Sequence, residues 1–250
     1  VVFNALHGRY GEDGYIQSIL ENEKVKYTHS GVLSSFYAID KEISKKIFIK
    51  NNILTPRYIK FNFKKKFNKN FFFKYLKKKI GFPVVIKPLN EGSSVNVFIC
   101  NSSNILKKMK RLVNYREILI EKYIPGREIQ VAILGKRKLG AIELVPKRKF
   151  YDYQAKYNKS AKTKHIIPVN ISKMNYDKVT NIALRAHKLL KCRGVTRSDF
   201  RFYKNKFYLL ETNTQPGMTS LSLVPEIARY KNISFNNLVE KILDDASINK

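Results

Sequence analysis

The chain has 250 residues, of which 44% are apolar and 12% aromatic, so it can bury a sizeable core, and disordered or collagen-like chains are excluded. Its two cysteines, Cys100 and Cys192, exclude a disulfide framework and a cysteine zinc site, and they favour a reducing compartment such as the cytoplasm. The formal net charge is +30, and no apolar run reaches the roughly 18 residues that a bilayer-spanning helix needs.

The basic charge has two interpretations. A nucleic-acid or anionic-membrane surface would account for it. However, 37 lysines outnumber 12 arginines, whereas proteins that read phosphates and base edges rely on the planar donor fork of arginine. The lysines are scattered among many Asn, Ile, Phe and Tyr residues. This mixture favours a genome-wide drift toward A/T-rich codons over a dedicated binding surface.

The first third of the chain alternates loops with helical patterns. The apolar start, Val1–Leu6, is typical of the middle of a buried strand and lacks an initiator Met and a basic signal-peptide region, so we expect the chain to be truncated at its N-terminus. A glycine-punctuated loop over 7–14 precedes a helix over about Tyr15–Asn22, and helical periodicity runs from Val32 to Asn51. A strand is predicted over 57–63.

The segment Lys60–Lys79 holds nine lysines interleaved with seven aromatic residues. It has two interpretations, a polyanion-binding patch with stacking aromatic rings and an amphipathic helix with Phe inward and Lys outward. We favour the amphipathic helix.

From Phe82 onward, short apolar runs bounded by turns predict strands that alternate with helices. Strands are predicted over 83–88, 95–100, 117–124, 128–134, 138–145, 194–203 and 206–211, and helices over 104–116, 177–190 and 235–243. The polar segment 151–169 is typical of a lid or Ω-loop, and 212–220 is a loop. Because hairpins interrupt the alternation, the fold class is α/β or α+β.

Three polar side chains are predicted to meet at the end of the 194–211 hairpin. Glu211 and Asn213 lie two residues apart on one strand and therefore face the same way, toward the side on which Asp199 of the paired strand projects. Carboxylate and amide oxygens suit Mg²⁺, which takes the rest of its shell from nucleotide phosphates. The alternative is an ordinary polar hairpin mouth.

Two basic residues add to this hypothesis. Lys87 ends a predicted buried strand before a Gly92-Ser93-Ser94 turn, whose N–H groups can cradle phosphate. Arg197, two residues before Asp199, points the same way and can neutralise charge that develops during group transfer. Among the histidines, His7 is the site candidate because it lies beside Gly8 in a loop, whereas His187 is interpreted as a packing residue of the 177–190 helix.

Six segments of the chain, taken together, resemble the D-alanine–D-alanine ligase family of the ATP-grasp superfamily. They are residues 2–14, 27–32, 83–88, 91–95, 150–157 and 210–219. The resemblance covers essentially the whole chain in order. Unrelated ATP-grasp enzymes share the metal hairpin but lack the Tyr151–Tyr157 loop and the Pro216–Thr219 segment.

The resemblance implies an ATP-grasp fold with a partial N-terminal Rossmann-like domain over 1–39, a central subdomain over 40–124 and a C-terminal subdomain over 125–250. It implies ATP-dependent ligation of two D-alanines through an acyl phosphate, for peptidoglycan precursor synthesis, with two Mg²⁺ ions for which Mn²⁺ can substitute. It further implies a cytoplasmic homodimer with no specific nucleic-acid or membrane partner.

Site residues follow from the matching positions. The resemblance implies ATP binding by Lys41, Lys87, Glu121, Lys122 and Glu128, and metal binding by Asp199, Glu211 and Asn213. It implies catalytic roles for Ser93, Tyr157, Arg197 and Gly217, with the Ser93–Tyr157 pair closing the 151–169 loop, and substrate binding by His7, Lys156, Ser222 and Leu223.

The chain also departs from the family pattern. The family begins with a βαβ unit that carries a glutamate for the first D-alanine, and we expect this unit to be missing here, which leaves the substrate site incomplete. Asn96 and His29 replace glycines and are expected to shift the backbone near the site. The alternatives are a carboxylate–amine ligase with another second substrate, or an inactive remnant with non-specific polyanion binding.

Overall fold

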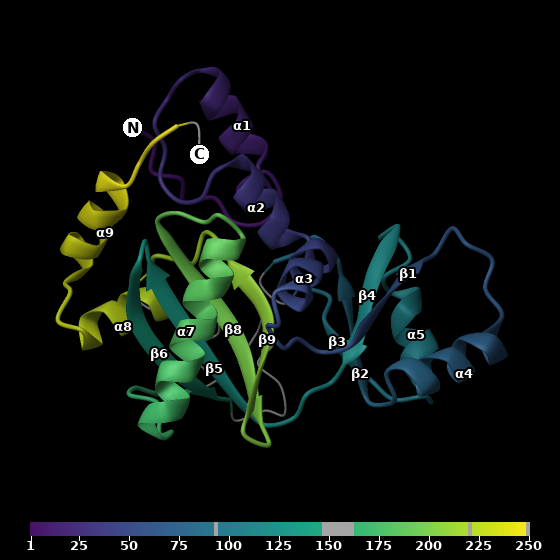
Figure 1. Ribbon diagram of the computed structural model, residues 1–250. Helices are drawn as coiled ribbons and strands as arrows, with labels where there is room; N and C mark the ends of the chain where they lie inside the picture. The colour runs from purple at the N-terminus through teal and green to yellow at the C-terminus, as the bar shows by residue number, and fades with distance from the viewer. Residues whose placement is uncertain (93–94, 147–162, 220–221, 249–250) are drawn as a thin grey trace.

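The computed structural model describes residues 1–92, 95–146, 163–219 and 222–248. Two antiparallel sheets lie next to each other, with helix α3 (Lys41–Lys50) between them and the first two helices, α1 (Tyr15–Asn22) and α2 (Val32–Ile39), at one end (Figure 1). The mixed fold class predicted from the alternation of strands, helices and hairpins is confirmed. The predicted domain boundaries near residues 39 and 124 stay predictions.

The predicted buried strand at the start of the chain is wrong. Val2 makes a single parallel bridge with Tyr27, and Val1 is 75% exposed. A strand is stabilised by neighbours on its edges, and within the described ranges residues 1–6 have only this one bridge. The helix that follows the glycine loop begins and ends at the predicted residues, Tyr15 and Asn22.

The helical periodicity over Val32–Asn51 comes from two helices instead of one. Asp40 has an extended conformation, with φ −77° and ψ 105°, which ends α2. Its carboxylate accepts hydrogen bonds from the backbone N–H groups of Glu42 and Ile43, both at 2.9 Å, and so caps the start of α3. The break redirects the chain, and Lys41 and Lys45 of α3 become buried.

The first sheet has the strand order β1-β4-β2-β3. Its strands are β1 (Tyr58–Asn62), β2 (Val84–Pro88), β3 (Phe98–Cys100) and β4 (Glu117–Lys122), and its helices are α4 (Lys69–Lys79) and α5 (Ile105–Lys110). Val84 and Ile86 of β2 join α4 and α5 in one core. Val85 and Lys87 alternate with them and therefore face the other way, toward the second sheet.

The amphipathic-helix interpretation of the lysine-rich segment 60–79 is confirmed for residues 69–79 only, which form α4, whereas residues 60–62 belong to β1. Phe72 and Leu76 of α4 are buried, and all the lysines of residues 60–79 are exposed. Phe71 and Tyr75 stay on the outer face, where their rings stack with centroids 6.0 Å apart.

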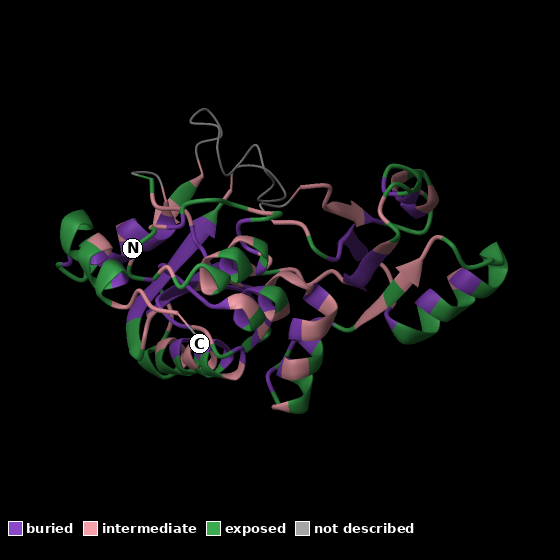
Figure 2. Cartoon of the chain, turned by 90° about the horizontal axis from the view of Figure 1, so that it is seen from above, coloured by how far each residue is buried: buried purple, intermediate pink, exposed green. Residues whose placement is uncertain are grey.

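The second sheet has the order β7-β6-β5-β8-β9. Its strands are β5 (Arg127–Leu134), β6 (Arg137–Val145), β7 (Lys164–Ile166), β8 (Val195–Tyr203) and β9 (Lys206–Asn213). Helix α7 (Lys173–Leu189) packs on one face, against Ile129 and Val131, and helices α8 (Leu223–Tyr230) and α9 (Phe235–Asp244) belong to the core on the opposite face. Figure 2 shows buried strands in the interior and helices whose outer faces are exposed.

Two details of this half differ from the predictions. Strand β7 occupies part of the segment predicted as a lid loop, whose residues up to 162 lie outside the described ranges. Helix α8 was not predicted; its Pro225 lies in the first turn, where proline is tolerated. Among the described residues, no helix combines the length and apolar content that crossing a membrane requires.

Candidate functional site

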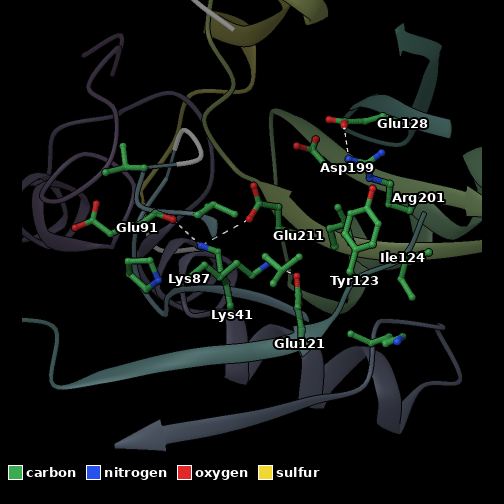
Figure 3. A pocket seen from close by; sticks show the side chains of 16 residues that line it. Lys41, Lys87, Glu91, Glu121, Tyr123, Ile124, Glu128, Asp199, Arg201 and Glu211 are labelled. Carbon is green, nitrogen blue, oxygen red and sulfur yellow. Dashed lines mark hydrogen bonds and ion pairs between the residues drawn. The ribbon is translucent and has the colours of Figure 1, made fainter. Parts of the chain in front are cut away.

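A cavity lies between the two sheets (Figure 3). Strands β2 and β4 supply one wall, and strands β8 and β9 supply the facing wall. The residues predicted to bind ATP, together with two of the predicted metal ligands, line this single cavity; they are Lys41, Lys87, Glu121, Lys122, Glu128, Asp199 and Glu211.

Buried lysines and a buried glutamate form the inner end of the cavity. The Lys87 ammonium lies 2.6 Å from Oε1 of Glu121, and the Lys45 ammonium lies 2.9 Å from Oε2 of the same carboxylate. Lys41 donates to the Glu91 carbonyl at 2.5 Å and lies 3.6 Å from Oε2 of Glu211 (Figure 3). Lys41 therefore connects the lysine wall to the carboxylate wall.

Burial and pairing act against each other on the pKa values of this cluster. Burial lowers the pKa of Lys41, although the Glu211 carboxylate counteracts it. Burial likewise lowers the pKa of Lys45 to about 8. Burial alone would raise the pKa of Glu121, but Lys45 and Lys87 together bring it below its ordinary value. Glu121 is thus held as a carboxylate between two ammonium groups.

The far end of the cavity is polar and ordered by main-chain contacts. The Lys122 ammonium donates to the carbonyls of Gly81 and Phe82, at 3.2 and 2.8 Å. Glu128 forms an ion pair with Arg201, with 3.0 Å between Oε2 and Nη2, and Arg201 also donates to the Gly126 carbonyl at 3.1 Å (Figure 3).

The predicted convergence on the hairpin is confirmed. Asp199 pairs in register with Glu211, and Arg197 pairs with Asn213, so all four side chains lie on one face of the β8–β9 pair. The Arg197 guanidinium donates to both oxygens of Asp199, at 2.8 and 3.1 Å. Asn213 Oδ1 accepts a hydrogen bond from the backbone N–H of Gln215 at 2.8 Å, which orients its amide.

This donor set fits a hard cation that also binds phosphate. Two carboxylates and an amide oxygen are ligands that Mg²⁺ accepts. In the described part of the chain, no group of three or more His, Cys, Asp or Glu side chains is arranged for a metal ion. Because Mg²⁺ takes six ligands, an ion held by these three oxygens would have positions left for phosphate oxygens.

A second cavity adjoins the first, and Lys41 and Glu211 line both. It brings together the predicted residues His7, Arg197, Asn213 and Gly217. A hydrogen bond to the Glu12 carboxylate raises the pKa of His7 above its ordinary value. Glu12 also accepts a hydrogen bond from the Gly8 N–H at 2.8 Å, which holds the glycine loop against the cavity.

The remaining predicted residues are placed differently. Ser222 and Leu223 are not among the described residues that line the two cavities. The Ser222 hydroxyl accepts from the Thr219 N–H at 3.0 Å and lies close to Gly217, where an added Cβ would come within 2.8 Å of it. Leu223 packs in the core with α8. The predictions for Ser93, Lys156 and Tyr157 fall outside the described residues.

The two departures from the family pattern keep a glycine-like backbone. His29 and Asn96 have φ values of 67° and 55°, in the left-handed region that favours glycine. His29 is buried and packs edge-on against Phe3, with 5.6 Å between ring centroids. Its burial lowers its pKa to about 4.

Sequence reasoning missed four residues of the site region, namely Lys45, Arg201, Glu12 and Gln215. Lys45 had one available signal, because it lies four residues after Lys41 and so on the same face of a helix. Arg201 also had an available signal, because it lies two residues after Asp199 on β8, just as Asp199 lies two residues after Arg197, so the three side chains share one face of the strand. Glu12 and Gln215 act through contacts with Gly8 and Asn213, which only the folded chain reveals.

Comparison with known proteins gives consistent results. The family model described as "D-ala D-ala ligase C-terminus" matches residues 47–244. The D-alanine--D-alanine ligase of Pelagibacter ubique (strain HTCC1062) is 68% identical over 250 residues, 100% of this chain and 82% of that protein. The one from Wolbachia pipientis wMel is 44% identical over 260 residues, 98% of this chain and 77% of that protein.

Solved structures agree with these sequence matches. The crystal structure of D-alanine--D-alanine ligase from Bacillus anthracis superposes with a TM-score of 0.86 at 36% identity, covering 97% of this chain and 78% of that one. The structure of that enzyme complexed with ATP gives a TM-score of 0.83 at 31% identity, with 97% and 77% covered. The similarity confirms the predicted ATP-grasp fold class.

Proposed function

The chain belongs to the D-alanine–D-alanine ligase family, and from this premise we propose that it joins two D-alanine molecules to D-alanyl-D-alanine while ATP is converted to ADP and phosphate, for peptidoglycan precursor synthesis. One observation supports the proposal above the others. The lysine wall, with Lys41 and Lys87, faces the carboxylate wall, with Asp199 and Glu211, across one cavity that adjoins a second one lined by Arg197 and His7.

The cavity between the sheets is the proposed ATP site. Lys41 and Lys87 bind the phosphates, because their ammonium groups are buried at its inner end and provide positive charge where water is largely excluded. Lys122 and Glu121 border the adenine, and Glu128 accepts the ribose hydroxyls, with Arg201 holding its carboxylate in place.

Asp199, Glu211 and Asn213 are the proposed ligands of the two Mg²⁺ ions, for which Mn²⁺ can substitute. When bound, these ions neutralise phosphate charge during transfer. The protein's own contribution is to keep the three oxygen donors on one face, through the β8–β9 register and the Gln215 N–H that orients Asn213.

The adjoining cavity is the proposed D-alanine site. The carboxylate of the first D-alanine attacks the γ-phosphorus of ATP, which gives D-alanyl phosphate and ADP. The amine of the second D-alanine then attacks the acyl carbon, phosphate leaves, and the amine loses a proton. Arg197 and the Gly217 N–H stabilise the oxyanion that forms between these events. His7 borders the substrates in the described cavity. Lys156, Ser222 and Leu223 are assigned to substrate binding on the family resemblance, and Ser93 and Tyr157 to the closure that keeps water from the acyl phosphate.

The test is phosphate release from Mg-ATP with D-alanine, with L-alanine and with neither. It uses residues 1–250 and, in parallel, the chain extended by the N-terminal βαβ unit predicted above. We expect release that requires D-alanine, is accompanied by D-alanyl-D-alanine, and is abolished by Asp199→Asn. D-Lactate and D-serine replace the second D-alanine in further reactions. An absence of D-alanine dependence in both forms would refute the ligase function.

Family membership also supports a cytoplasmic homodimer as a proposal. Light scattering on the purified protein should give twice the monomer mass of 29.2 kDa, and cell fractionation should recover the protein with the cytoplasm. A monomer at micromolar concentration would contradict the first part.

A further inference from the structure

Lys45 is buried in an unusual setting. Among the described lysines only Lys41, Lys45 and Lys87 are buried, and Lys45 alone has no exposed side-chain surface. Lys41 and Lys87 line the cavity between the sheets, whereas Lys45 lies behind it. An ammonium group in such a place costs stability compared with an apolar side chain of similar size. Packing alone therefore does not account for a lysine at this position.

Lys45 is connected to the proposed phosphate site through one shared partner, Glu121. Its ammonium donates to the Thr55 hydroxyl at 2.7 Å and pairs with Oε2 of Glu121 at 2.9 Å. The other oxygen of Glu121, Oε1, lies 2.6 Å from the Lys87 ammonium. Glu121 is thus held between a lysine behind the cavity and a lysine that lines it.

We propose that Lys45 is a positioning residue for nucleotide binding, which holds Glu121 and thereby places the Lys87 ammonium toward the phosphates. This inference rests on the proposed function. Lys45 touches no ligand in the cavity, so its effect is transmitted through the Glu121 carboxylate.

The charges explain why a second lysine is needed. Glu121 and Lys87 alone form a neutral pair, which would attract phosphate weakly. With Lys45 the three groups carry a net charge of +1, so Lys87 keeps part of its charge for the ligand. The other groups around Lys45 are Lys41 on the same helix, Glu211 on β9 and the Tyr58 ring on β1, 5.9 Å away. Its pKa of about 8 leaves most of its charge in place at neutral pH.

The test is calorimetric titration of Mg-ADP into the protein. Lys45→Met should raise the dissociation constant about tenfold or more, whereas the KM for D-alanine should change less than twofold. Lys46→Met is the matched control, because Lys46 is the next residue of α3, is 66% exposed and pairs only with Glu42 in the described contacts. It should change the dissociation constant less than twofold.

A conservative variant separates positioning from a structural role. Lys45→Arg keeps a positive charge beside Glu121, so we expect Mg-ADP affinity within about threefold of the wild type, which also keeps the test decisive if Lys45→Met does not fold. Urea unfolding gives the free energy of unfolding of the wild type and of both variants. A structural role predicts instead that both variants lose affinity in proportion to their loss of unfolding free energy.

The outcomes distinguish the inference from its premise. Wild-type protein that does not bind Mg-ADP would overturn the proposed function and the role of Lys45 with it. Wild-type binding that Lys45→Met leaves within twofold would overturn the role of Lys45 alone. Weaker binding by Lys45→Met that Lys45→Arg largely restores would support it.

Discussion

The two faces of the four-stranded sheet both carry lysines, in very different surroundings. On the face that meets the second sheet, Lys87 is buried and paired with Glu121. On the other face, the lysines of α4 lie in water around the exposed Phe71 and Tyr75. Exposed charges are screened beyond about 8 Å in physiological salt, whereas buried charges are screened much less. In a chain with a net charge of +30, the lysines that matter for chemistry are therefore the few that the fold removes from water.

The largest expected effect tests the buried face. Lys87→Met should lower kcat/KM for ATP by about 10²–10³-fold, since removing one preorganised charge from a site has an effect of this size. Lys79→Met on α4 is the control and should change it less than twofold. Steady-state phosphate release measures both. Equal effects of the two substitutions would remove the distinction between the faces.

The same contrast between buried and exposed groups applies to stability in acid. His187 is buried on α7, its Nδ1 lies 2.8 Å from the Thr196 hydroxyl, and burial lowers its pKa from 6.5 to about 4. The unfolded chain therefore binds a proton between pH 6.5 and 4 that the folded chain does not, and stability falls as the pH falls through this window. The loss attributable to His187 is about 3 kcal/mol at pH 4.

His187→Asn, which keeps a polar group for Thr196, should remove that part of the pH dependence. Urea unfolding at pH 7, 5.5 and 4.5 measures it. The variant should be less stable than the wild type at pH 7, and the difference should shrink or reverse toward pH 4.5. Parallel curves for the two proteins would contradict the assignment.

A smaller effect is expected at the far end of the nucleotide cavity. Arg201→Met removes the ion pair with Glu128, so the proposed ribose acceptor loses orientation but keeps its charge. The KM for ATP should rise about tenfold, which corresponds to about 1.4 kcal/mol, with kcat nearly unchanged. A fall in kcat without a change in KM would place Arg201 in the chemical step instead.

The smallest effect concerns the exposed face. Replacing Lys77, Lys78 and Lys79 by glutamine should leave the KM for ATP within twofold of the wild type. The same variant should elute from a heparin column at lower salt, because exposed lysines contribute a non-specific, salt-dependent attraction to polyanions. A changed KM for ATP would show that the lysines on the α4 surface affect nucleotide binding in the cavity.

Local sequence patterns predicted the parts of the molecule that depend on neighbouring residues. The helix Tyr15–Asn22 followed from apolar spacing between two turns, and the grouping of Asp199, Glu211 and Asn213 followed from the period of two along paired strands. The same logic failed at Val1–Leu6, because an apolar run does not specify which strand will pair with it. Helix α8, which has Pro225 in its first turn, was not predicted from these patterns.

The sequence by itself determined the mixed fold class, the family and the residues at which ATP, metal and substrate binding are proposed, since these reside in short motifs and in periodicity. Only the tertiary structure decided which lysines are buried and which side chains pair with them. Lys45 and Lys46 are adjacent and chemically identical, yet one is fully buried against Glu121 and the other is 66% exposed beside Glu42. That difference arises because Glu121 approaches α3 from β4, which is distant in sequence, while Thr55 approaches it from the segment that follows α3. The long-range part of this packing is specified by the whole fold and not by any local pattern.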